Sequence, residues 1–173
     1  MTDSGNFVFG KTYLNANNHI DRKKLGALVF GNKIKLRLLN KAIHPILIKR
    51  IRQEIKHLEN KHYHKRIKPL LVLEAAILYE TKMDRLVDEV MVVYAPKSIR
   101  IKRIKVRDKL TIREIEARIV SQMPLKQKMK KAKTIIDNSG RITKTFKQVE
   151  LMYTILYLLS NLKEMENYTE RMQ

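Results

Sequence analysis

The sequence predicts an α/β fold in which helices cover both faces of a parallel sheet. Three short apolar runs carry this prediction, namely Leu70–Glu74, Glu89–Tyr94 and Thr134–Asp137. Each run begins or ends at a proline or a turn, as buried parallel strands do. Segments with helical spacing of apolar residues separate the runs. Strands that alternate with helices in this way are typical of a parallel sheet with helical connections.

The part before the first predicted strand, residues 21–68, has the pattern of helices. Asp21 is a typical N-cap for a short helix that Gly31 ends. Apolar residues then recur at helical spacing, and Pro45 is predicted to begin a second helix because proline fits a first helical turn. The His- and Lys-rich stretch 57–68 ends this helical part.

Helices are also predicted after the second strand and at the end of the chain. Ile99–Val106 predicts one helix, and a second begins after Thr111, which has Glu114 in the capping-box position. The last helix is predicted from about Thr143 to Met165. We expect one domain over residues 1–173, made of a helical part (21–68), core strands (69–96 and 132–140), a region between them (97–131) and a C-terminal helix (141–173).

Length and composition describe a globular chain. With 173 residues, of which 44% are hydrophobic, the chain can bury a core and is not a disordered protein. It has no cysteine, which excludes a disulfide scaffold and thiolate metal sites and fits a cytoplasmic location. Met1–Gly10 has no signal-peptide pattern, and the longest apolar stretch, Leu151–Leu159, is too short to span a bilayer. We therefore expect no membrane association.

The formal net charge of +20 is concentrated in two blocks. Residues 33–68 hold 12 lysines and arginines against two acids, and residues 97–133 hold 14 against three. Residues 69–96 have a net charge of −3, and the last forty residues are neutral. Basic blocks of this kind attract polyanions such as nucleic acid or polyphosphate ligands. The alternative is a Lys-rich composition carried on solvated helix faces.

A match to the Walker A pattern of phosphate loops occurs at Gly5–Thr12. In a working loop the backbone amides cradle phosphates between a strand and a helix. Only four residues precede Gly5, and the residues after Thr12 are turn-like. Phe7–Phe9 are also too bulky for a tight wrap around phosphate. We therefore predict that this segment is not a working phosphate loop.

Four further segments carry a family resemblance. In chain order they are Leu14–Gly26 followed by His44 and Pro45; Glu74–Glu80; Arg103–Asp108 followed by Ala117–Ile119 and Gln122–Pro124; and Ile135–Gly140. In this order and spacing, over nearly all of residues 14–140, they resemble the dephospho-coenzyme A kinase family. The resemblance implies an incomplete three-layer P-loop kinase fold with a parallel sheet, a helical substrate-binding insert over 21–68 and a mobile lid over 97–131.

The same resemblance implies an activity. The family transfers the γ-phosphoryl group of ATP to the ribose 3′-hydroxyl of dephospho-coenzyme A, the last step of coenzyme A synthesis. The implied ligands are therefore ATP as co-substrate, Mg²⁺ and dephospho-coenzyme A. The basic block of the lid would meet the ATP phosphates, and the helical block would lie near the acidic coenzyme.

Five residues of the lid region are candidates for contact with ATP. Arg103 and Arg107 lie four apart on one helix face and match the lid arginines of the family. Arginine suits this role because its guanidinium binds phosphate in a planar, bidentate way. Arg118 and Gln122 repeat the spacing, and Lys128 falls where the family usually has a basic residue. The alternative for each is a solvated side chain.

Five other residues are candidates on weaker grounds. Asn138 and Gly140 follow the last strand, where open sheets bind ligands, or else form a plain turn. By the resemblance, Glu74, Glu80 and His44 lie near the substrate or magnesium. Their structural alternatives are a strand-end cap, a helix cap and a structural histidine. No metal site made of protein ligands alone is expected, since the histidines between 57 and 64 match no zinc spacing.

The sequence departs from the family at its start. The family begins with a strand, a Gly-rich phosphate loop and a second strand that bears an Asp thought to be the general base. None of these is found before residue 14, so we assign no catalytic base and expect a chain without the phosphate-loop portion. Loss of central strands would expose apolar sheet edges, which predicts self-association or poor solubility.

Three functions therefore stay open on sequence alone. The first is a kinase of this family, whose start is either truncated or wrongly assigned. The second is a basic nucleic-acid-binding protein, which the lack of an RNA-binding motif and of clustered aromatic residues disfavours. The third is a coenzyme-binding remnant without catalysis.

Overall fold

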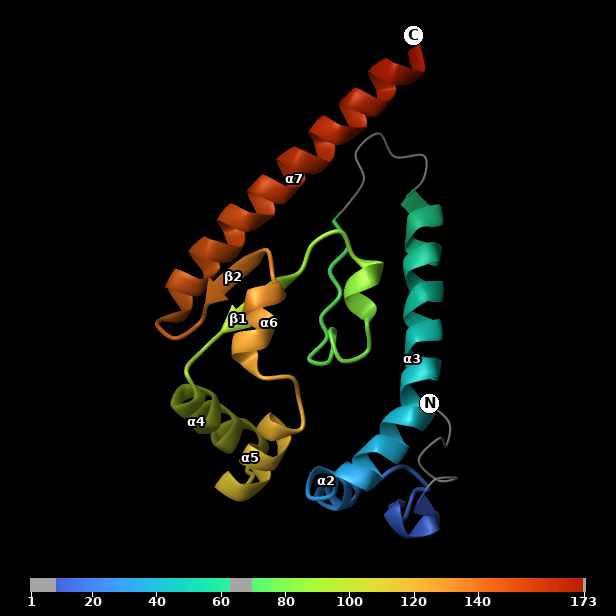
Figure 1. Cartoon of the computed structure of the whole chain (residues 1–173), viewed down its shortest axis with the longest axis vertical. Helices are drawn as coiled ribbons and strands as arrows, with labels where there is room; N and C mark the ends of the chain where they lie inside the picture. Colours follow the sequence, from blue (N-terminus) through green and yellow to red (C-terminus); the bar gives the residue numbers. More distant parts are fainter. Residues whose placement is uncertain (1–8, 63–69, 173) are drawn as a thin grey trace.

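The structure is a computed structural model that describes residues 9–62 and 70–172 (Figure 1). Helices dominate it, and two short strands lie near its centre. The elements are η1 (Lys11–Tyr13), α2 (Arg22–Phe30), α3 (Lys33–His62), η2 (Met83–Leu86), β1 (Met91–Tyr94), α4 (Lys97–Asp108), α5 (Ile112–Val120), α6 (Leu125–Lys131), β2 (Thr134–Asp137) and α7 (Ile142–Met172).

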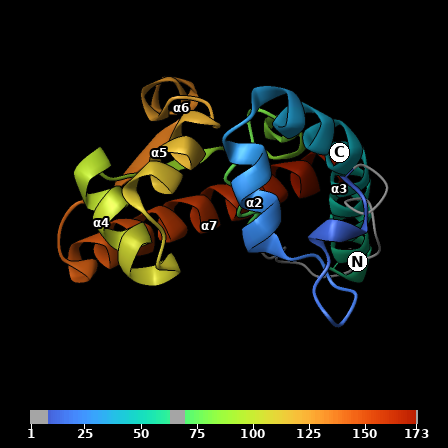
Figure 2. The same cartoon turned by 90° about the horizontal axis from the view of Figure 1, so that it is seen from below.

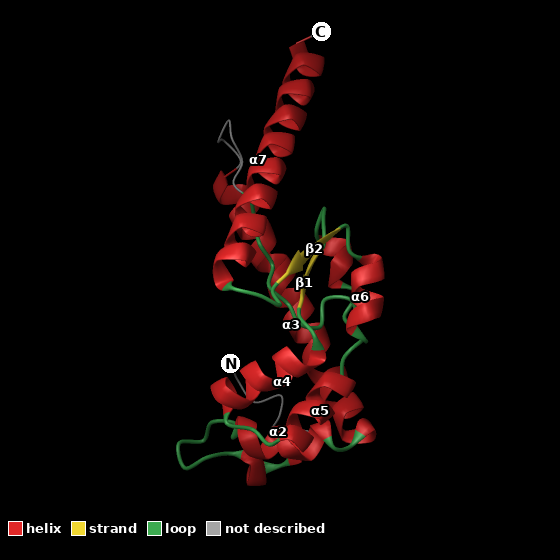
Figure 3. Ribbon diagram, turned by 90° about the vertical axis from the view of Figure 1, so that its left-hand side faces the viewer, coloured by secondary structure: helices red, strands yellow, loops and turns green. Residues whose placement is uncertain are grey.

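β1 and β2 pair in parallel and form the sheet of the described part of the chain. The register runs from Met91 opposite Thr134 to Tyr94 opposite Asp137. A parallel pair needs a long crossover connection, and α4, α5 and α6 supply it. α6 packs on β1 and α7 on β2, and Figures 1 and 3 show the strands between these two helices. The predicted α/β class with a parallel sheet is confirmed.

The second group of packed elements consists of α2, α4 and α5, which lie together at one end of the molecule (Figures 1 and 2). α5 packs against both α2 and α4. Among the described residues, the buried apolar side chains belong to this group of helices, to the sheet with the residue that follows β1, or to η2, which precedes β1. They are Leu25, Val29, Met83, Val92, Ala95, Leu110, Ile115 and Ile136.

The helix caps that the sequence predicted are present. The Asp21 carboxylate accepts hydrogen bonds from the backbone N–H groups of Lys23 and Lys24, both at 3.0 Å. At the start of α5, the Thr111 hydroxyl accepts from the Glu114 N–H at 3.3 Å, and the Glu114 carboxylate accepts from the Thr111 N–H at 2.8 Å. These bonds satisfy backbone donors that the first helical turn leaves free, so they place the starts of α2 and α5.

The prediction of a buried strand over Leu70–Glu74 is wrong. The segment has no regular secondary structure, and the Val72 side chain is 90% exposed. An extended run becomes a strand only when its backbone N–H and C=O groups pair with a neighbour. Within the described residues no strand lies beside this segment, so its apolar composition is not enough to form one.

Pro45 does not begin a second helix, because α3 runs through it without a break. A proline inside a helix removes one backbone hydrogen bond, and the remaining bonds of a 30-residue helix carry the chain past it. Two further helices differ from prediction. α6 was not predicted, and α7 extends further at its C-terminal end. The predicted self-association through a sheet edge stays a prediction.

We predict that α5 is fixed to the core by one side chain. Ile115 is completely buried, so Ile115→Ala should lower the free energy of unfolding by about 2–5 kcal/mol, measured by urea denaturation. Ile112 lies on the same helix and is 52% exposed, so Ile112→Ala should cost less than about 1 kcal/mol. Equal losses for the two variants would contradict the packing described here.

Candidate functional site

The loop after β2 meets an arginine from α4. The Arg103 guanidinium donates a hydrogen bond from Nη1 to the backbone oxygen of Asn138 at 2.7 Å. Asn138 in turn donates its backbone N–H to the Tyr94 oxygen at 2.7 Å and accepts from the Thr145 hydroxyl at 3.1 Å. The carboxyl ends of both strands, α4 and α7 are therefore joined at one point, and two of the predicted site residues, Arg103 and Asn138, are in contact.

Arg107 and Arg118 share one carboxylate, that of Asp108. Arg107 donates from Nε and Nη2 to the two oxygens of Asp108 at 2.7 and 3.0 Å, and Arg118 Nη1 lies 3.9 Å from Asp108 Oδ2. The hydrogen bonds from Arg107, helped by the charge of Arg118, hold the pKa of Asp108 below its ordinary value against a smaller opposing effect of burial. The two arginines, on α4 and α5, are thus brought together.

A small cavity of about 240 Å³ lies between α2 and α5, next to Arg118. The Arg118 guanidinium stacks over the Phe30 ring at 5.2 Å from its centroid, which fixes its plane. The lining includes three basic side chains and one acidic one. It consists of Lys23, Gly26, Ala27, Phe30, Gly31, Leu110, Arg113, Glu114, Ala117 and Arg118. A net positive lining of this kind favours an anionic ligand.

Lys128 and Glu80 form an ion pair that is mostly shielded from solvent. Lys128 Nζ lies 2.8 Å from Glu80 Oε1, with side-chain exposures of 13% and 20%, and it also donates to the Ala76 oxygen at 2.6 Å. Glu80 Oε1 accepts from the Met123 N–H at 2.7 Å as well. Burial acts to raise the pKa of Glu80, but these hydrogen bonds outweigh it and hold the pKa below its ordinary value. The pair ties the turn before η2 to α6.

His44 lies within electrostatic reach of Glu80. Burial lowers the pKa of His44, and the Glu80 carboxylate partly opposes that effect. His44 Nε2 and Glu80 Oε2 are both buried and lack a hydrogen-bond partner in the structure. Three predicted residues, His44, Glu80 and Lys128, are therefore gathered where α3, the turn before η2 and α6 approach one another.

The remaining predicted site residues lie at the surface of the structure. Glu74 and Gln122 are exposed, and Gly140 is exposed in the turn before α7. No group of three or more His, Cys, Asp or Glu side chains in the described residues could hold a metal ion. Glu74 does not complete such a group, so these residues do not form a magnesium site by themselves.

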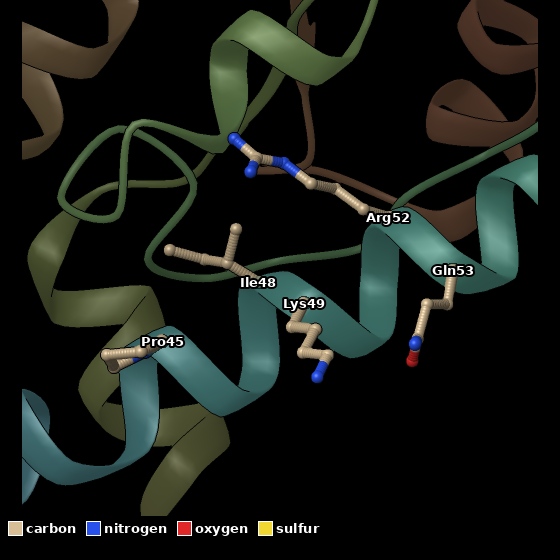
Figure 4. A pocket seen from close by; sticks show the side chains of 5 residues that line it. All are labelled: Pro45, Ile48, Lys49, Arg52 and Gln53. Carbon is tan, nitrogen blue, oxygen red and sulfur yellow. The ribbon is translucent and has the colours of Figure 1, made fainter.

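A larger hollow, of about 560 Å³, lies along α3 (Figure 4). Pro45, Ile48, Lys49, Arg52 and Gln53 line it. Figure 4 shows Ile48 and Arg52 projecting from one side of the helix and Lys49 and Gln53 from another. Because all five lining residues belong to a single helix, the hollow has no second wall among them that could enclose a ligand, and it is not part of the candidate site.

The Walker A match lies mostly outside the described residues. In its described part, the three-residue 3₁₀ turn η1 follows Gly10, and an antiparallel bridge between Leu14 and Ile20 comes next. No α-helix begins at Thr12. This part therefore agrees with the sequence-based rejection of a working loop.

Membrane-spanning helices were also not expected from the sequence. Among residues 9–62 and 70–172, no helix combines the length and the apolar composition that a membrane span requires.

Comparison with known proteins decides the family. The profile described as dephospho-CoA kinase matches residues 6–144. The chain belongs to the dephospho-CoA kinase family. Dephospho-CoA kinases of Carboxydothermus hydrogenoformans and Bacillus cereus are 44% and 37% identical to it, over 82% and 84% of this chain. The chain spans 66% and 70% of the length of these two relatives.

A solved structure supports the same fold. The crystal structure of TT1252 from Thermus thermophilus superposes with a TM-score of 0.61 at 26% identity, covering 83% of this chain and 71% of that one. Membership of the family confirms the resemblance read from the four sequence segments. The role of each site residue in this chain stays a proposal.

Sequence reasoning missed the residues that organise the arginines. Asp108 was noted only as part of the family pattern, and Phe30, Lys23 and Arg113 were not singled out. The adjacency of Arg107 and Asp108 was a usable signal, since neighbouring opposite charges often pair. The contact of Phe30 with Arg118 joins residues 88 positions apart, and the pattern of one sequence has no signal for it.

We predict that the Glu80–Lys128 pair stabilises the fold above acidic pH. Glu80→Gln should lower the free energy of unfolding at pH 7 by about 1–3 kcal/mol, because it leaves Lys128 without its countercharge. The pKa of Glu80 is lower in the folded chain than its ordinary 4.5, so its carboxylate stabilises the fold above about pH 4.5. That contribution is lost as the pH falls through the lower, folded pKa, and the two proteins should converge in acid.

The control is Glu116→Gln, which breaks the solvent-exposed pair of Glu116 with Lys97. Exposed pairs contribute about 0–1 kcal/mol, so this variant should resemble the wild type in chemical denaturation at pH 7. If Glu80→Gln were as stable as Glu116→Gln, the assignment of Glu80 as a structural anchor would fail.

Proposed function

We propose that this chain acts in coenzyme A biosynthesis as an ATP-dependent kinase that phosphorylates the ribose 3′-hydroxyl of dephospho-CoA. The observation that carries the proposal is the set of arginines that α4 and α5 present, with Arg103 on the loop after β2 and Arg107 and Arg118 on Asp108, in a chain of the dephospho-CoA kinase family. A cytoplasmic location for the activity stays a prediction from the cysteine-free composition.

The chemistry of phosphoryl transfer fits such a set of arginines. The reaction depends chiefly on holding the two substrates in line and on neutralising the charge that develops on the phosphoryl oxygens. Arginine provides both effects, since its planar guanidinium donates paired hydrogen bonds to phosphate. Arg107 is the most accessible of the described ion-paired arginines, with 76% of its side chain exposed, so it can reach a ligand by rotating away from Asp108.

The proposal assigns a role to each part of the chain. Residues 97–131 form the lid and residues 21–68 the substrate-binding part. ATP and lid contacts belong to Arg103, Arg107, Arg118, Gln122, Lys128, Asn138 and Gly140, and His44, Glu74 and Glu80 lie toward the substrate. Lys128 acts by holding α6 through Glu80. Mg²⁺ enters together with ATP.

The test is a coupled assay of the full chain with ATP and dephospho-CoA, with calorimetry of each ligand. We expect Arg107→Ala to weaken ATP binding or turnover by about 10- to 100-fold, the effect of losing charge-assisted hydrogen bonds to phosphate. The matched control is Lys105→Ala, which removes the same charge from the opposite face of α4, where Lys105 is exposed. The control should retain wild-type affinity within about threefold.

The possible outcomes separate the functions that the sequence left open. Binding of dephospho-CoA without turnover would support a coenzyme-binding remnant and overturn the kinase proposal. Steeply salt-dependent binding of an oligonucleotide, without any response to ATP or dephospho-CoA, would instead support a nucleic-acid-binding protein. Equal losses in Arg107→Ala and Lys105→Ala would show a general charge effect rather than a site.

A further inference from the structure

The first turns of α7 lie beside β2 (Figure 1), and two of their side chains, Thr145 and Gln148, hold the end of that strand. The two residues are three positions apart, so they share one side of the helix. The Gln148 amide oxygen accepts the Asp137 N–H at 2.9 Å, and its amide nitrogen donates to the Asp137 backbone oxygen, also at 2.9 Å. Gln148 thus pairs with the last residue of β2 as a neighbouring strand would.

Thr145 extends this contact to the next residue of the chain. It is buried, with 9% of its surface exposed. Its hydroxyl donates to the Asn138 side-chain oxygen at 3.1 Å and lies 3.4 Å from the Asp137 backbone oxygen. The Asn138 N–H donates to the Tyr94 oxygen of β1 at 2.7 Å. Asn138 is therefore held from β1 and from α7 at once.

The backbone oxygen of Asn138, held in this way, is the acceptor on which Arg103 rests. The bond from Arg103 Nη1 is 2.7 Å long. An arginine has many rotamers in solvent, and a fixed acceptor restricts them. Its guanidinium has several N–H donors in one plane, so one bond to Asn138 leaves the others for a ligand. Arg103 is exposed, so those donors face solvent from which a ligand arrives.

We propose that Thr145 and Gln148 are positioning residues for Arg103. They fix residues 137–138, and through the Asn138 carbonyl they fix the plane in which the Arg103 guanidinium meets the phosphates of ATP. Neither side chain touches the nucleotide in this assignment, so both act only through Arg103. The meeting of Arg103 with ATP rests on the proposed function, whereas the positioning of Arg103 does not.

The first test measures the Arg103 side chain itself, by nuclear magnetic resonance of the full chain. The guanidinium N–H signals of Arg103, assigned by comparison with Arg103→Lys, should show restricted motion in the wild type. Thr145→Val keeps the side-chain shape but removes the hydroxyl, so it should increase that motion. Gln148→Met should act in the same way. Thr145→Ser retains the hydroxyl and should restore the wild-type signals.

The second test is a double-mutant cycle on ATP affinity, measured by calorimetry. Thr145→Val should weaken ATP binding by about 3- to 10-fold in the wild-type background. In an Arg103→Ala background the same change should alter the affinity by less than about twofold, because the side chain through which it acts is gone. A merely structural role would weaken binding equally in both backgrounds, and that result would overturn the proposal.

The matched control is Thr154→Val, the same substitution on the same helix. Thr154 is exposed, and its hydroxyl donates to the Glu150 backbone oxygen at 3.0 Å. This variant should keep the wild-type Arg103 signals and ATP affinity. Circular dichroism should show equal helix content in all variants, and if Thr145→Val lost helix, Gln148→Met would take its place in the cycle.

Two failures are distinguishable. Arg103 signals that stay unchanged in Thr145→Val and Gln148→Met would overturn the positioning role, whatever the chain binds. A wild type that does not bind ATP would instead overturn the proposed function, and the Arg103 signals would still decide whether Thr145 and Gln148 hold this arginine in place.

Discussion

The parallel pairing of β1 with β2 is the constraint on which the rest of the structure depends. Two strands that run in the same direction cannot be joined by a tight turn, so the chain must leave the end of β1 and return to the start of β2. The return path consists of α4, α5 and α6. Pairing therefore decides where these three helices sit, and it brings the ends of both strands to the same edge as Arg103.

Several basic residues of the crossover are held by specific acceptors. Arg103 binds a backbone oxygen, Arg107 and Arg118 share Asp108, and Lys128 is paired with Glu80. These contacts fix the four cations at three acceptor groups along the α4–α6 region, so their positive charge has a defined geometry. This arrangement is what distinguishes the region from α3, whose lysines and arginines form no ion pair in the described residues.

Sequence reasoning predicted those elements that are determined by local interactions. The N-cap at Asp21 and the capping box of Thr111 with Glu114 were read correctly, because such caps involve residues two or three positions apart. The Leu70–Glu74 run was misread because a strand depends on a distant neighbour. A buried strand and an unpaired apolar segment have the same composition.

The candidate site was predicted only in part, because some of its contacts follow from local spacing and others join distant positions. The shared helix face of Arg103 and Arg107 follows from their spacing, so it could be read from the sequence. The anchoring of Lys128 by Glu80 spans 48 positions and became visible only in the structure. Family resemblance supplied what local patterns could not, since the order of four separated motifs carries information about distant contacts.

The Asp108 carboxylate has a consequence for any nucleotide that docks against α4 and α5. Under the proposed function, a phosphate oxygen would compete with this carboxylate for Arg107 and Arg118. A bound phosphate would thus displace an internal anion rather than meet bare cations, and the affinity would reflect the difference between two competing acceptors. Such an exchange would return Arg107 to its hydrogen bonds with Asp108 when the ligand departs, which would ease release of the ligand.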